Sequence, residues 1–367
     1  MQNDFHELRV SRTERQTDDA SVLYFEVPEA LAAAFDYAPG QYITLEVTVG
    51  GQPERRAYSM CTSPLHRGEI GVCVKRLPGG KVSNYLLDAV KPGDAVAVMP
   101  PDGRFVARTD PAQRKTYYLI GAGSGITPLM SIARTVVERE PGSAVHLLYG
   151  NRDERSIIFA DELEAMDTRY NGQFTVDHVL SRPERKKAGG LGGFFGKKVS
   201  TWSGRTGRVD PQELKRFLAE REPRTDKRAY YICGPGAMID TVEKELLRGG
   251  VPAEQIHTER FVVAPVADAD KVASAEGNVV RVTLDGKTHE VSVAADKTIL
   301  ETLVDQGHNP PYSCTSGACS TCIAKVTRGE VKMDVNHALD PDEVEEGYCL
   351  TCQAHPVTAE VELSYDE

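Results

Sequence analysis

The 367-residue chain contains no apolar run that approaches the ~18 residues a membrane-spanning helix needs. Its first residues, MQNDFHELRV, lack the apolar stretch of a secretory signal, so we expect a cytoplasmic protein. Basic residues are not in excess, because 43 Lys and Arg stand against 54 Asp and Glu, a net charge of −11. This charge argues against nucleic acid or a membrane as the main partner. The length and the 40% hydrophobic content instead predict a globular protein of two or three domains.

Cysteine is scarce in most of the chain, since five of the eight cysteines lie between Cys314 and Cys352. The region from Asn278 to Glu367 also contains 6 basic and 16 acidic residues, a net charge of −10. Without a secretory signal, metal binding explains a cysteine cluster better than disulfides do. The last quarter is therefore predicted to be a separate, acidic, metal-binding domain.

Residues 1–112 consist mainly of short segments rich in β-branched residues, separated by glycine and proline. We expect short helices only near 28–34 and 83–89. Strands are expected at 41–47, 69–75 and 94–98. This pattern predicts an antiparallel β-barrel.

In residues 113–261 predicted strands and helices alternate, which indicates an α/β domain with a parallel sheet. One helix should start at Thr127-Pro128, and Asp210 should cap another. The expected strands are 117–120, 144–149, 175–180 and 229–233, and the other expected helices are 158–165, 211–221 and 237–248.

Three further segments complete the organisation. Residues 262–277 show no periodicity and are interpreted as an interdomain linker. Residues 278–367 form the last domain, with strands expected at 279–284 and 289–293 and a helix at 298–306. The stretch 185–205 combines glycines with lysines, which predicts a long flexible loop.

Four cysteines have the spacing of plant-type [2Fe–2S] ligands, because Cys314, Cys319 and Cys322 follow a C-x4-C-x2-C pattern and Cys352 lies thirty residues on. The residues between the first three are small, so backbone N–H groups could donate to the cluster sulfurs. Zinc is the alternative, since Cys319/Cys322 and Cys349/Cys352 form two CxxC pairs. Their separation of 26 residues exceeds the usual 15–20, and zinc leaves Cys314 unexplained. We therefore predict a cluster held by Cys314, Cys319, Cys322 and Cys352, and a packing role for Cys349.

Two turns could bind a dinucleotide. Gly121-Ala-Gly123-Ser-Gly125-Ile-Thr127-Pro128 lies between a predicted strand and helix, where a pyrophosphate could meet the helix N-terminus. It differs from G-x-G-x-x-G, and a plain tight turn is the alternative. Cys233-Gly-Pro-Gly236 ends a later strand and leaves room for a flat ring, although Cys233 alone could equally be a buried thiol.

In the first segment, Arg56-Ala-Tyr58-Ser59 places a cation, an aromatic face and a hydroxyl within four residues. On a strand, Arg56 and Tyr58 share one face. Alone, these four residues would also fit an ordinary barrel surface.

Five motifs in this order resemble the ferredoxin–NADP reductase superfamily fused to a C-terminal plant-type ferredoxin. They are Arg56-x-Tyr58-Ser59, Gly80-Lys-Val82-Ser83, the 121–128 turn, Cys233-Gly-Pro235 and the four cysteines. The resemblance covers nearly the whole chain. It implies a multi-domain fold: an antiparallel FAD-binding β-barrel (1–112), an NAD(P)-binding α/β domain with a parallel sheet (113–261) and an α+β β-grasp ferredoxin domain (278–367).

The details are most similar to the reductase subunits of bacterial phenylacetyl-CoA epoxidases. The reductases of 3-ketosteroid 9α-hydroxylases are the nearest rival, followed by those of other ring-hydroxylating oxygenases. The stretches that carry this similarity are 149–152, 156–159, 256–261 and 333–354.

The resemblance also implies roles for residues. Arg56 would bind the FAD phosphate, Tyr58 would lie against the isoalloxazine and Ser59 would hydrogen-bond near N5. The FAD pyrophosphate would be held by Gly80, Val82 and Ser83, and the nicotinamide dinucleotide by Gly121, Gly123, Gly125, Thr127, Gly234 and Pro235. Cys233 would lie near nicotinamide C4, with Glu259 close to the same ring and Phe261 covering the flavin. Ser59, Cys233, Glu259 and Phe261 are therefore the candidate catalytic residues.

The choice of nicotinamide cofactor depends on Ser181-Arg182. This pair follows a predicted strand where NADPH-using relatives have a Ser-Arg pair for the 2′-phosphate, and Arg185, Lys186 and Lys187 add charge nearby. Charge-assisted contacts to a phosphate favour NADPH. A solvated basic loop, with NADH as cofactor, is the alternative.

The predicted electron route runs from NAD(P)H to FAD, then to [2Fe–2S], then to an oxygenase partner. A hydride carries two electrons and the cluster accepts one, so a flavin belongs between them. The acidic last domain would steer the partner, unless its charge serves solubility alone. Two other classes remain open: an electron carrier or assembly subunit without enzymatic activity, and a zinc-stabilised flavin reductase.

Overall fold

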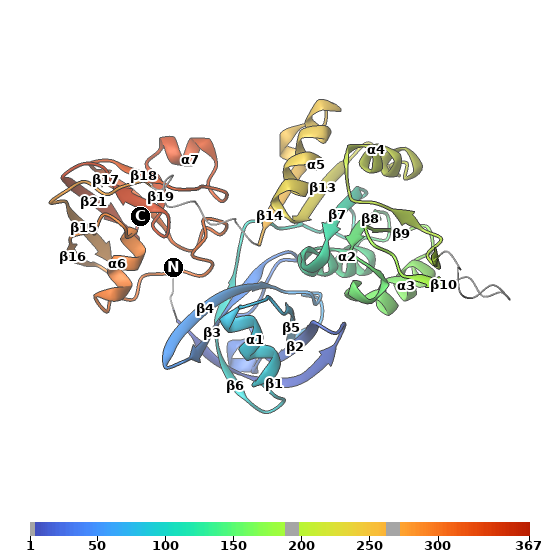
Figure 1. Ribbon diagram of the computed structural model, residues 1–367, viewed down its shortest axis with the longest axis horizontal. Coiled ribbons are helices and arrows are strands. Elements are labelled where there is room, and N and C mark those ends of the chain that lie inside the picture. The colour runs from blue at the N-terminus through green and yellow to red at the C-terminus, as the bar shows by residue number, and fades with distance from the viewer. Residues whose placement is uncertain (1–3, 188–197, 262–271) are drawn as a thin grey trace.

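The computed structural model describes residues 4–187, 198–261 and 272–367. Three sheets follow one another along the chain, coloured blue, green to yellow, and orange to red (Figure 1). Part of the predicted linker, 262–271, and the centre of the predicted loop, 188–197, lie outside the described residues. No helix of the described ranges has both the length and the apolar character needed to cross a lipid bilayer.

The first sheet is an antiparallel barrel, as predicted. Its strands are β1 (His6–Arg15), β2 (Ala20–Glu26), β3 (Tyr42–Val49), β4 (Gln52–Ser59), β5 (Glu69–Lys75) and β6 (Ala95–Asp102). They are ordered β4-β3-β6-β1-β2-β5, and a bridge between Met60 and Val72 joins the end of β4 to β5. Helix α1 (Lys81–Asp88) buries Val82 and Leu86 against this barrel. The helix expected near 28–34 is only a 3-10 turn, Glu29–Leu31, because it buries no residue that would stabilise a longer one.

The second sheet is parallel throughout, which confirms the α/β prediction. Its strands are β7 (Thr116–Ala122), β8 (Ala144–Asn151), β9 (Phe174–Leu180), β12 (Arg205–Thr206), β13 (Arg228–Gly234) and β14 (Ile256–Arg260), in the order β12-β9-β8-β7-β13-β14. The edge strands β12 and β14 carry no strand signal in the sequence, since β12 has two residues and β14 is only half-buried and mostly polar.

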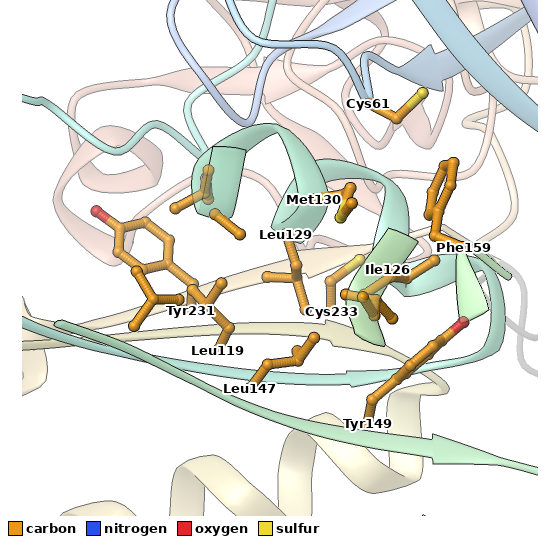
Figure 2. Packing of buried hydrophobic residues seen from close by; sticks show 14 of the residues in the cluster. Cys61, Leu119, Ile126, Leu129, Met130, Leu147, Tyr149, Phe159, Tyr231 and Cys233 are labelled. Atoms are coloured by element: carbon orange, nitrogen blue, oxygen red, sulfur yellow. The ribbon is translucent and has the colours of Figure 1, made fainter. Parts of the chain in front are cut away.

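Four helices cover this sheet on both faces. They are α2 (Ile126–Arg139), α3 (Ala160–Arg169), α4 (Pro211–Glu220), which Asp210 caps as predicted, and α5 (Gly236–Arg248). Alternation along β7 sends Tyr117 and Leu119 into the core under α2 and α3, and Tyr118 and Ile120 into the core under α4 and α5. The first of these cores also contains barrel residues, and Figure 2 shows barrel residue Cys61 across α2 from Leu147 of the sheet. The barrel and the α/β unit therefore share one hydrophobic core.

The stretch 185–205 differs from the expected flexible loop at both ends. Strand β10 (Arg185–Lys187) pairs with β11 (Lys198–Ser200) in an antiparallel ladder. Three short 3-10 turns lie elsewhere in the α/β unit: Gly123–Gly125, Glu154–Ser156 and Ala253–Gln255.

The third sheet has the mixed α+β arrangement predicted for the last domain. Its strands are β15 (Val279–Leu284), β16 (Lys287–Val291), β17 (Ile323–Arg328), β19 (Tyr348–Leu350) and β21 (Glu360–Ser364), ordered β16-β15-β21-β17-β19. The central pair β15 and β21 is parallel. Helix α6 (Ile299–Asp305) begins at a capping box formed by Thr298 and Glu301 and packs its apolar side on the sheet. A small sheet of β18 (Val331–Met333) and β20 (Ala354–Pro356) and the short helix α7 (Pro341–Glu345) complete the unit.

Candidate functional site

A cavity of about 310 Å³, called the inner cavity below, lies where the three units meet. Strand β4 and the start of α1 line one side of it, the α/β unit contributes a second side, and the segment between Cys314 and Cys319 contributes a third. The predicted site residues in its lining are Arg56, Tyr58, Ser59, Gly80, Val82, Ser83, Thr127, Glu259, Phe261, Cys314 and Cys319. Residues separated by more than 250 positions in the sequence thus face one space.

On the barrel side, Arg56, the predicted phosphate-binding residue, shares the carboxylate of Glu54 with Lys81. Arg56 Nη2 lies 3.4 Å from Glu54 Oε2, and the other oxygen of Glu54 accepts from Lys81 Nζ at 2.7 Å. The hydrogen bond from Lys81 and the nearby charge of Arg56 lower the pKa of Glu54. Two cations therefore stand at one end of the inner cavity, which suits an anionic ligand.

Tyr58 and Ser59 also line the cavity. Tyr58 lies on the same face of β4 as Arg56, and Ser59 is the last residue of the strand. Burial raises the pKa of Tyr58, so its phenol stays protonated. Ser59 is 6% exposed and pairs in register with Tyr42 of β3. Tyr42 also lines the cavity but carries no sequence signal of its own.

The start of α1 is open to an anion. Gly80 precedes the helix, and no side chain of the described residues caps its N-terminus. A Cβ on Gly80 would lie 2.6 Å from Ser83 Oγ, which accepts a hydrogen bond from the Leu77 N–H. An uncapped helix N-terminus beside cations is the arrangement that phosphate groups prefer. The residues present therefore fit the phosphates of FAD.

A second cavity of about 840 Å³, the outer cavity, lies at the carboxyl ends of the parallel strands, which is where open α/β sheets bind ligands. Gly123, Ser181, Gly234 and Pro235 line it among the predicted residues. The N-termini of α2 and α5 carry no side-chain cap from the described residues. Asn151, also in the lining, has a buried side-chain nitrogen without a partner in the described residues. These uncapped termini and the orphaned amide fit a pyridine dinucleotide.

Glycine is required in the 121–128 turn for two different reasons. A Cβ on Gly125 would lie 2.1 Å from the backbone oxygen of Cys233, so only glycine lets the turn approach β13. Gly123 is favoured for its backbone conformation, because its φ of +56° lies in the left-handed region. A Cβ at this position would meet nothing within 4 Å. The turn is held by Tyr149 Oη, which donates to the Gly123 carbonyl at 2.9 Å, and by Thr127 Oγ1, which donates to the Ser124 carbonyl at 3.1 Å.

Among the predicted FAD- and dinucleotide-binding residues, Gly121, Gly125 and Cys233 line neither cavity as the described residues define them, and Arg182 lines only an adjoining hollow; the predicted ligands Cys322 and Cys352 also lie outside both linings. Cys233 is fully buried, and Figure 2 shows it beneath α2 beside Ile126 and Leu129. Burial raises the pKa of its thiol well above the ordinary value. The structure therefore places Cys233 behind the turn, packed under α2 (Figure 2).

Glu259 and Phe261 stand at the end of β14, where the two cavities meet. Glu259 is in register with Cys233 and lines the inner cavity. Burial, with the neighbouring Cys314 and Asp102, raises the pKa of Glu259 to about 8. Phe261 lines both cavities, as do Lys75, Leu77 and Ser124, so the two cavities adjoin along these residues.

Cations surround the far end of the outer cavity. Arg182 and Arg185 line an adjoining hollow with Ser181. Arg152 and Arg208 line the outer cavity itself; Arg152 ends the 149–152 stretch that carries the family resemblance, whereas no sequence motif marks Arg208. Arg208 follows Gly207 in a loop that is anchored by Arg205, whose guanidinium contacts Asp177, Glu213 and Glu220.

The cysteine loop, residues 314–322, folds tightly as its small residues predict. The N–H groups of Ser316 and Cys319 point to Cys314 Sγ at 3.4 and 3.3 Å. Gly317 has φ +70°, and a Cβ there would meet Val335 at 3.0 Å. Backbone donors thus converge on a sulfur, as an iron–sulfur ligand requires.

The four predicted ligands come together as two pairs. Cys314 and Cys319 share the lining of the inner cavity, and Cys322 and Cys352 pack together in one buried cluster. Within the described residues no three His, Cys, Asp or Glu side chains gather into a group that could hold one metal ion. Two thiol pairs suit a binuclear cluster, in which each iron takes two cysteines. Cys349 packs in the core under α6, as predicted.

Comparisons with known proteins agree with this arrangement. Three domain families match: the oxidoreductase FAD-binding domain at residues 7–106, the oxidoreductase NAD-binding domain at 119–244 and the 2Fe-2S iron-sulfur cluster binding domain at 282–357. The chain is 36% identical to one of the subunits of 1,2-phenylacetyl-CoA epoxidase from Escherichia coli K12, over 99% of this chain and 98% of the relative.

The chain is also 36% identical to the ferredoxin reductase component of 3-ketosteroid-9-alpha-monooxygenase from Mycolicibacterium smegmatis, over 98% of this chain and 97% of the relative. The solved structure of phthalate dioxygenase reductase matches with a TM-score of 0.62 and 25% identity, over 99% and 98% of the two chains. The chain belongs to the family of oxygenase reductases. It is an FAD- and iron–sulfur-dependent NAD(P)H oxidoreductase.

Membership of the oxygenase-reductase family gives each cavity a cofactor class. The FAD-binding match covers β4 and the start of α1, the NAD-binding match covers the outer cavity, and the 2Fe-2S match covers the cysteine loop. The family supports FAD, a pyridine nucleotide and a [2Fe–2S] cluster, and the residues found here fit all three.

Proposed function

We propose that this oxygenase reductase takes electrons from NADPH and supplies them to the oxygenase of a phenylacetyl-CoA epoxidase complex. The observation that carries the electron-transfer part is the inner cavity, where Tyr58 and Ser59 share a lining with Cys314 and Cys319. A flavin in that cavity would lie directly beside the cluster ligands, with no further protein layer between them.

The residues proposed to hold each group combine the sequence motifs with the linings, since Thr127 lines the inner cavity and Arg182 only the adjoining hollow. FAD would be held by Arg56, Tyr58, Ser59, Gly80, Val82 and Ser83. The dinucleotide would be held by Gly123, Thr127, Ser181, Arg182, Gly234 and Pro235, and its turn would be shaped by Gly121 and Gly125. The cluster would be held by Cys314, Cys319, Cys322 and Cys352. When bound, FAD would supply two-electron hydride chemistry with one-electron release, and the cluster would supply one-electron transfer.

The chain's own side chains control access and orientation. Phe261 lines both cavities, and in this proposal its ring covers the flavin and moves aside for the nicotinamide. Glu259 is half-buried, and burial raises the pKa of its carboxyl group, so it can hold a proton beside the inner cavity. Ser59 presents a buried hydroxyl to the same space. We assign the catalytic role to Ser59, Glu259 and Phe261, and a packing role behind the turn to Cys233.

NADPH is the proposed donor because Arg182 and Arg185 face a hollow beside Ser181, and Arg208 faces the neighbouring outer cavity. These guanidinium groups offer charge-assisted hydrogen bonds to a 2′-phosphate. Steady-state kinetics test this assignment: NADPH should have the higher kcat/KM, and an equal or higher value for NADH would overturn it.

The proposed acceptor rests on the full-length similarity to the epoxidase component from Escherichia coli. The reductase of a 3-ketosteroid monooxygenase is the second candidate, because its similarity is equally extensive. Reconstitution with each purified oxygenase separates them. Product formation from phenylacetyl-CoA, and not from a 3-ketosteroid, is the expected result.

A cytoplasmic location is proposed on the state of the thiols. All eight cysteines lie in described residues and are free, which suits a reducing compartment. We also propose domain limits of 1–112, 113–261 and 278–367, with 262–277 as the linker. Proteolytic fragments that begin or end inside these ranges would contradict the limits.

Anaerobic titration with NADPH tests the core of the proposal. Both the flavin and the iron–sulfur absorption bands should bleach. Bleaching of the flavin band alone, together with bound zinc, would identify a flavin reductase instead. Absence of NADPH-driven bleaching in FAD-loaded protein would identify a carrier without enzymatic activity.

A further inference from the structure

Strand β3 carries two buried hydroxyl groups that contact the C-terminal unit. Tyr42 Oη lies 2.7 Å from Thr321 Oγ1, and Thr44 Oγ1 donates to Ser313 Oγ at 2.8 Å. All four side chains are at most 4% exposed. Ser313 directly precedes the cysteine loop, and Thr321 directly precedes its last cysteine, so β3 contacts the loop at both ends.

Alternation along β3 explains how one strand serves two partners. Ile43 and Leu45 point into the barrel core, whereas Tyr42 and Thr44 face the opposite side. The same strand pairs with β4 in a register that sets Tyr42 opposite Ser59. Strand β3 therefore relates the position of the cysteine loop to that of the proposed flavin-binding strand.

A carboxylate completes the contact. Asp102, at the end of β6, has one oxygen 3.2 Å from both Tyr42 Oη and Thr321 Oγ1, and its other oxygen accepts from the Gly103 N–H at 2.7 Å. The side chains of Tyr42, Thr321 and Asp102 thus satisfy one another's hydrogen-bonding groups away from solvent. Loss of one partner there would leave an unpaired polar group and cost stability. Around this centre, an ion pair between Arg104 and Glu343 at 2.6 Å forms an exposed rim.

We propose that Tyr42, Thr44 and Asp102 are positioning residues that hold the cysteine loop against the inner cavity through Thr321 and Ser313. They set the distance over which an electron leaves the flavin site, and they do not take part in accepting the hydride. This inference rests on the proposed function. It adds that the rate of internal electron transfer depends on hydroxyl groups that bind no cofactor atom.

The test uses the full-length holoprotein and variants at residues that line neither cavity. Thr44→Val and Thr321→Val each remove a hydroxyl with little change of shape, and Thr44→Ser restores one. Thr302→Val is the matched control, since Thr302 is also a buried threonine of the C-terminal unit but donates only to the Thr298 carbonyl of its own helix.

Two measurements are made on each protein. Hydrogen exchange of residues 313–322 should become about tenfold faster in Thr44→Val and Thr321→Val, equivalent to ~1.4 kcal/mol of lost docking. After rapid mixing with NADPH, the flavin band should bleach at the wild-type rate, while the iron–sulfur band should bleach more slowly by a similar factor. Thr302→Val and Thr44→Ser should resemble wild type in both measurements.

Several results would overturn the inference. Unchanged exchange and unchanged iron–sulfur bleaching would do so, as would equal effects from Thr302→Val. Loss of the cluster in Thr321→Val with no effect of Thr44→Val would show a role in cluster assembly instead. If Thr44→Val does not fold, Ser313→Ala probes the same bond from its other end. A wild-type protein whose cluster never bleaches would instead refute the proposed function.

Discussion

The two cavities are built in different ways. The outer cavity lies at one edge of one parallel sheet, and its glycine turns and helix N-termini belong to a single unit. The inner cavity is smaller and takes lining residues from all three units. A site built mainly by one unit, to which the barrel adds only Lys75 and Leu77, depends on local backbone geometry, whereas a site between units depends on how they pack. The two cavities should therefore respond differently to substitution.

The largest effect is expected at the cluster ligands. Cys322→Ala should abolish the iron–sulfur absorption band and lower cytochrome c reduction by more than roughly 100-fold, because the proposed route delivers electrons to protein acceptors through the cluster and not directly from the flavin. Ferricyanide reduction, which needs only the flavin, should persist. Metal analysis and absorption spectra measure the cluster content, and the cytochrome c and ferricyanide assays measure the two activities.

Cys349→Ala is the matched control, since Cys349 is buried nearby but packs in the core under α6. It should keep the iron–sulfur band and lose only ~1 kcal/mol of stability from the small cavity. Loss of the band in this variant would show that Cys349, and not only the four predicted cysteines, is needed to hold the cluster.

The second largest effect is expected in the 121–128 turn, where substitution of Gly125 should destabilise the protein more than substitution of Gly123. Gly125→Ala places a Cβ 2.1 Å from the Cys233 oxygen, so β13 or the turn must move. We expect a loss of roughly 3 kcal/mol in unfolding free energy and weaker NADPH binding, because overpacking and a displaced helix N-terminus combine. Gly123→Ala meets open space and should cost only ~1 kcal/mol for its positive φ.

Denaturant unfolding and NADPH titration measure both glycine variants. Flavin affinity should change less than NADPH affinity in each, because the FAD-binding match lies outside this turn and only Ser124 and Thr127 of the turn line the inner cavity. Equal destabilisation by the two substitutions would contradict the distinction between close approach and backbone conformation.

A smaller effect is expected at the proposed 2′-phosphate site. Arg182→Ala should lower kcat/KM for NADPH by roughly tenfold to 100-fold, the worth of a charge-assisted hydrogen bond, and leave the value for NADH unchanged. Arg155→Ala is the control, because Arg155 is exposed nearby but pairs with Glu184 at 2.5 Å. An equal loss with both cofactors would indicate a general electrostatic effect.

The smallest effect should appear on acidification, in the α/β unit. Burial lowers the pKa of His146 on β8 to about 4, and it also lowers the pKa of His178 on β9. The unfolded chain therefore binds protons below about pH 6.5 while the folded chain does not, so stability falls as the pH drops from 6.5 towards 4. At pH 5 the loss from His146 should be about 1–2 kcal/mol.

Hydrogen exchange between pH 7 and 5 can resolve this loss by region. Strands β8 and β9 should lose protection before the barrel strands β1 and β2 do. His146→Gln should flatten the pH dependence. A pH dependence that is unchanged in this variant would show that His146 does not bind the proton.

The sequence predicted those features that depend on neighbours in the chain. Cysteine spacing identified the loop because its ligands lie within nine residues, and the glycine turn was found because its close approach demands glycine at Gly125. The three-unit fold followed from alternation of strands and helices. Strand β14 was missed, because its half-buried polar residues show no hydrophobic period.

Features that depend on packing between units could not be predicted in this way. Tyr42 and Thr321 are 279 residues apart, and no local pattern relates them. Arg152 and Arg208 reach the outer cavity only after β8 and the loop following β12 are placed in the sheet. The buried position of Cys233 likewise depends on α2, which lies above it in Figure 2.

The contact made by β3 has a consequence for engineering such proteins. A foreign ferredoxin domain grafted after residue 277, to direct electrons to a new oxygenase, would need hydroxyl residues at the positions of Ser313 and Thr321. Without them the graft could be correctly folded and loaded with its cluster and still receive electrons slowly. A one-residue insertion in β3 would be worse, because it would turn Tyr42 and Thr44 into the barrel core.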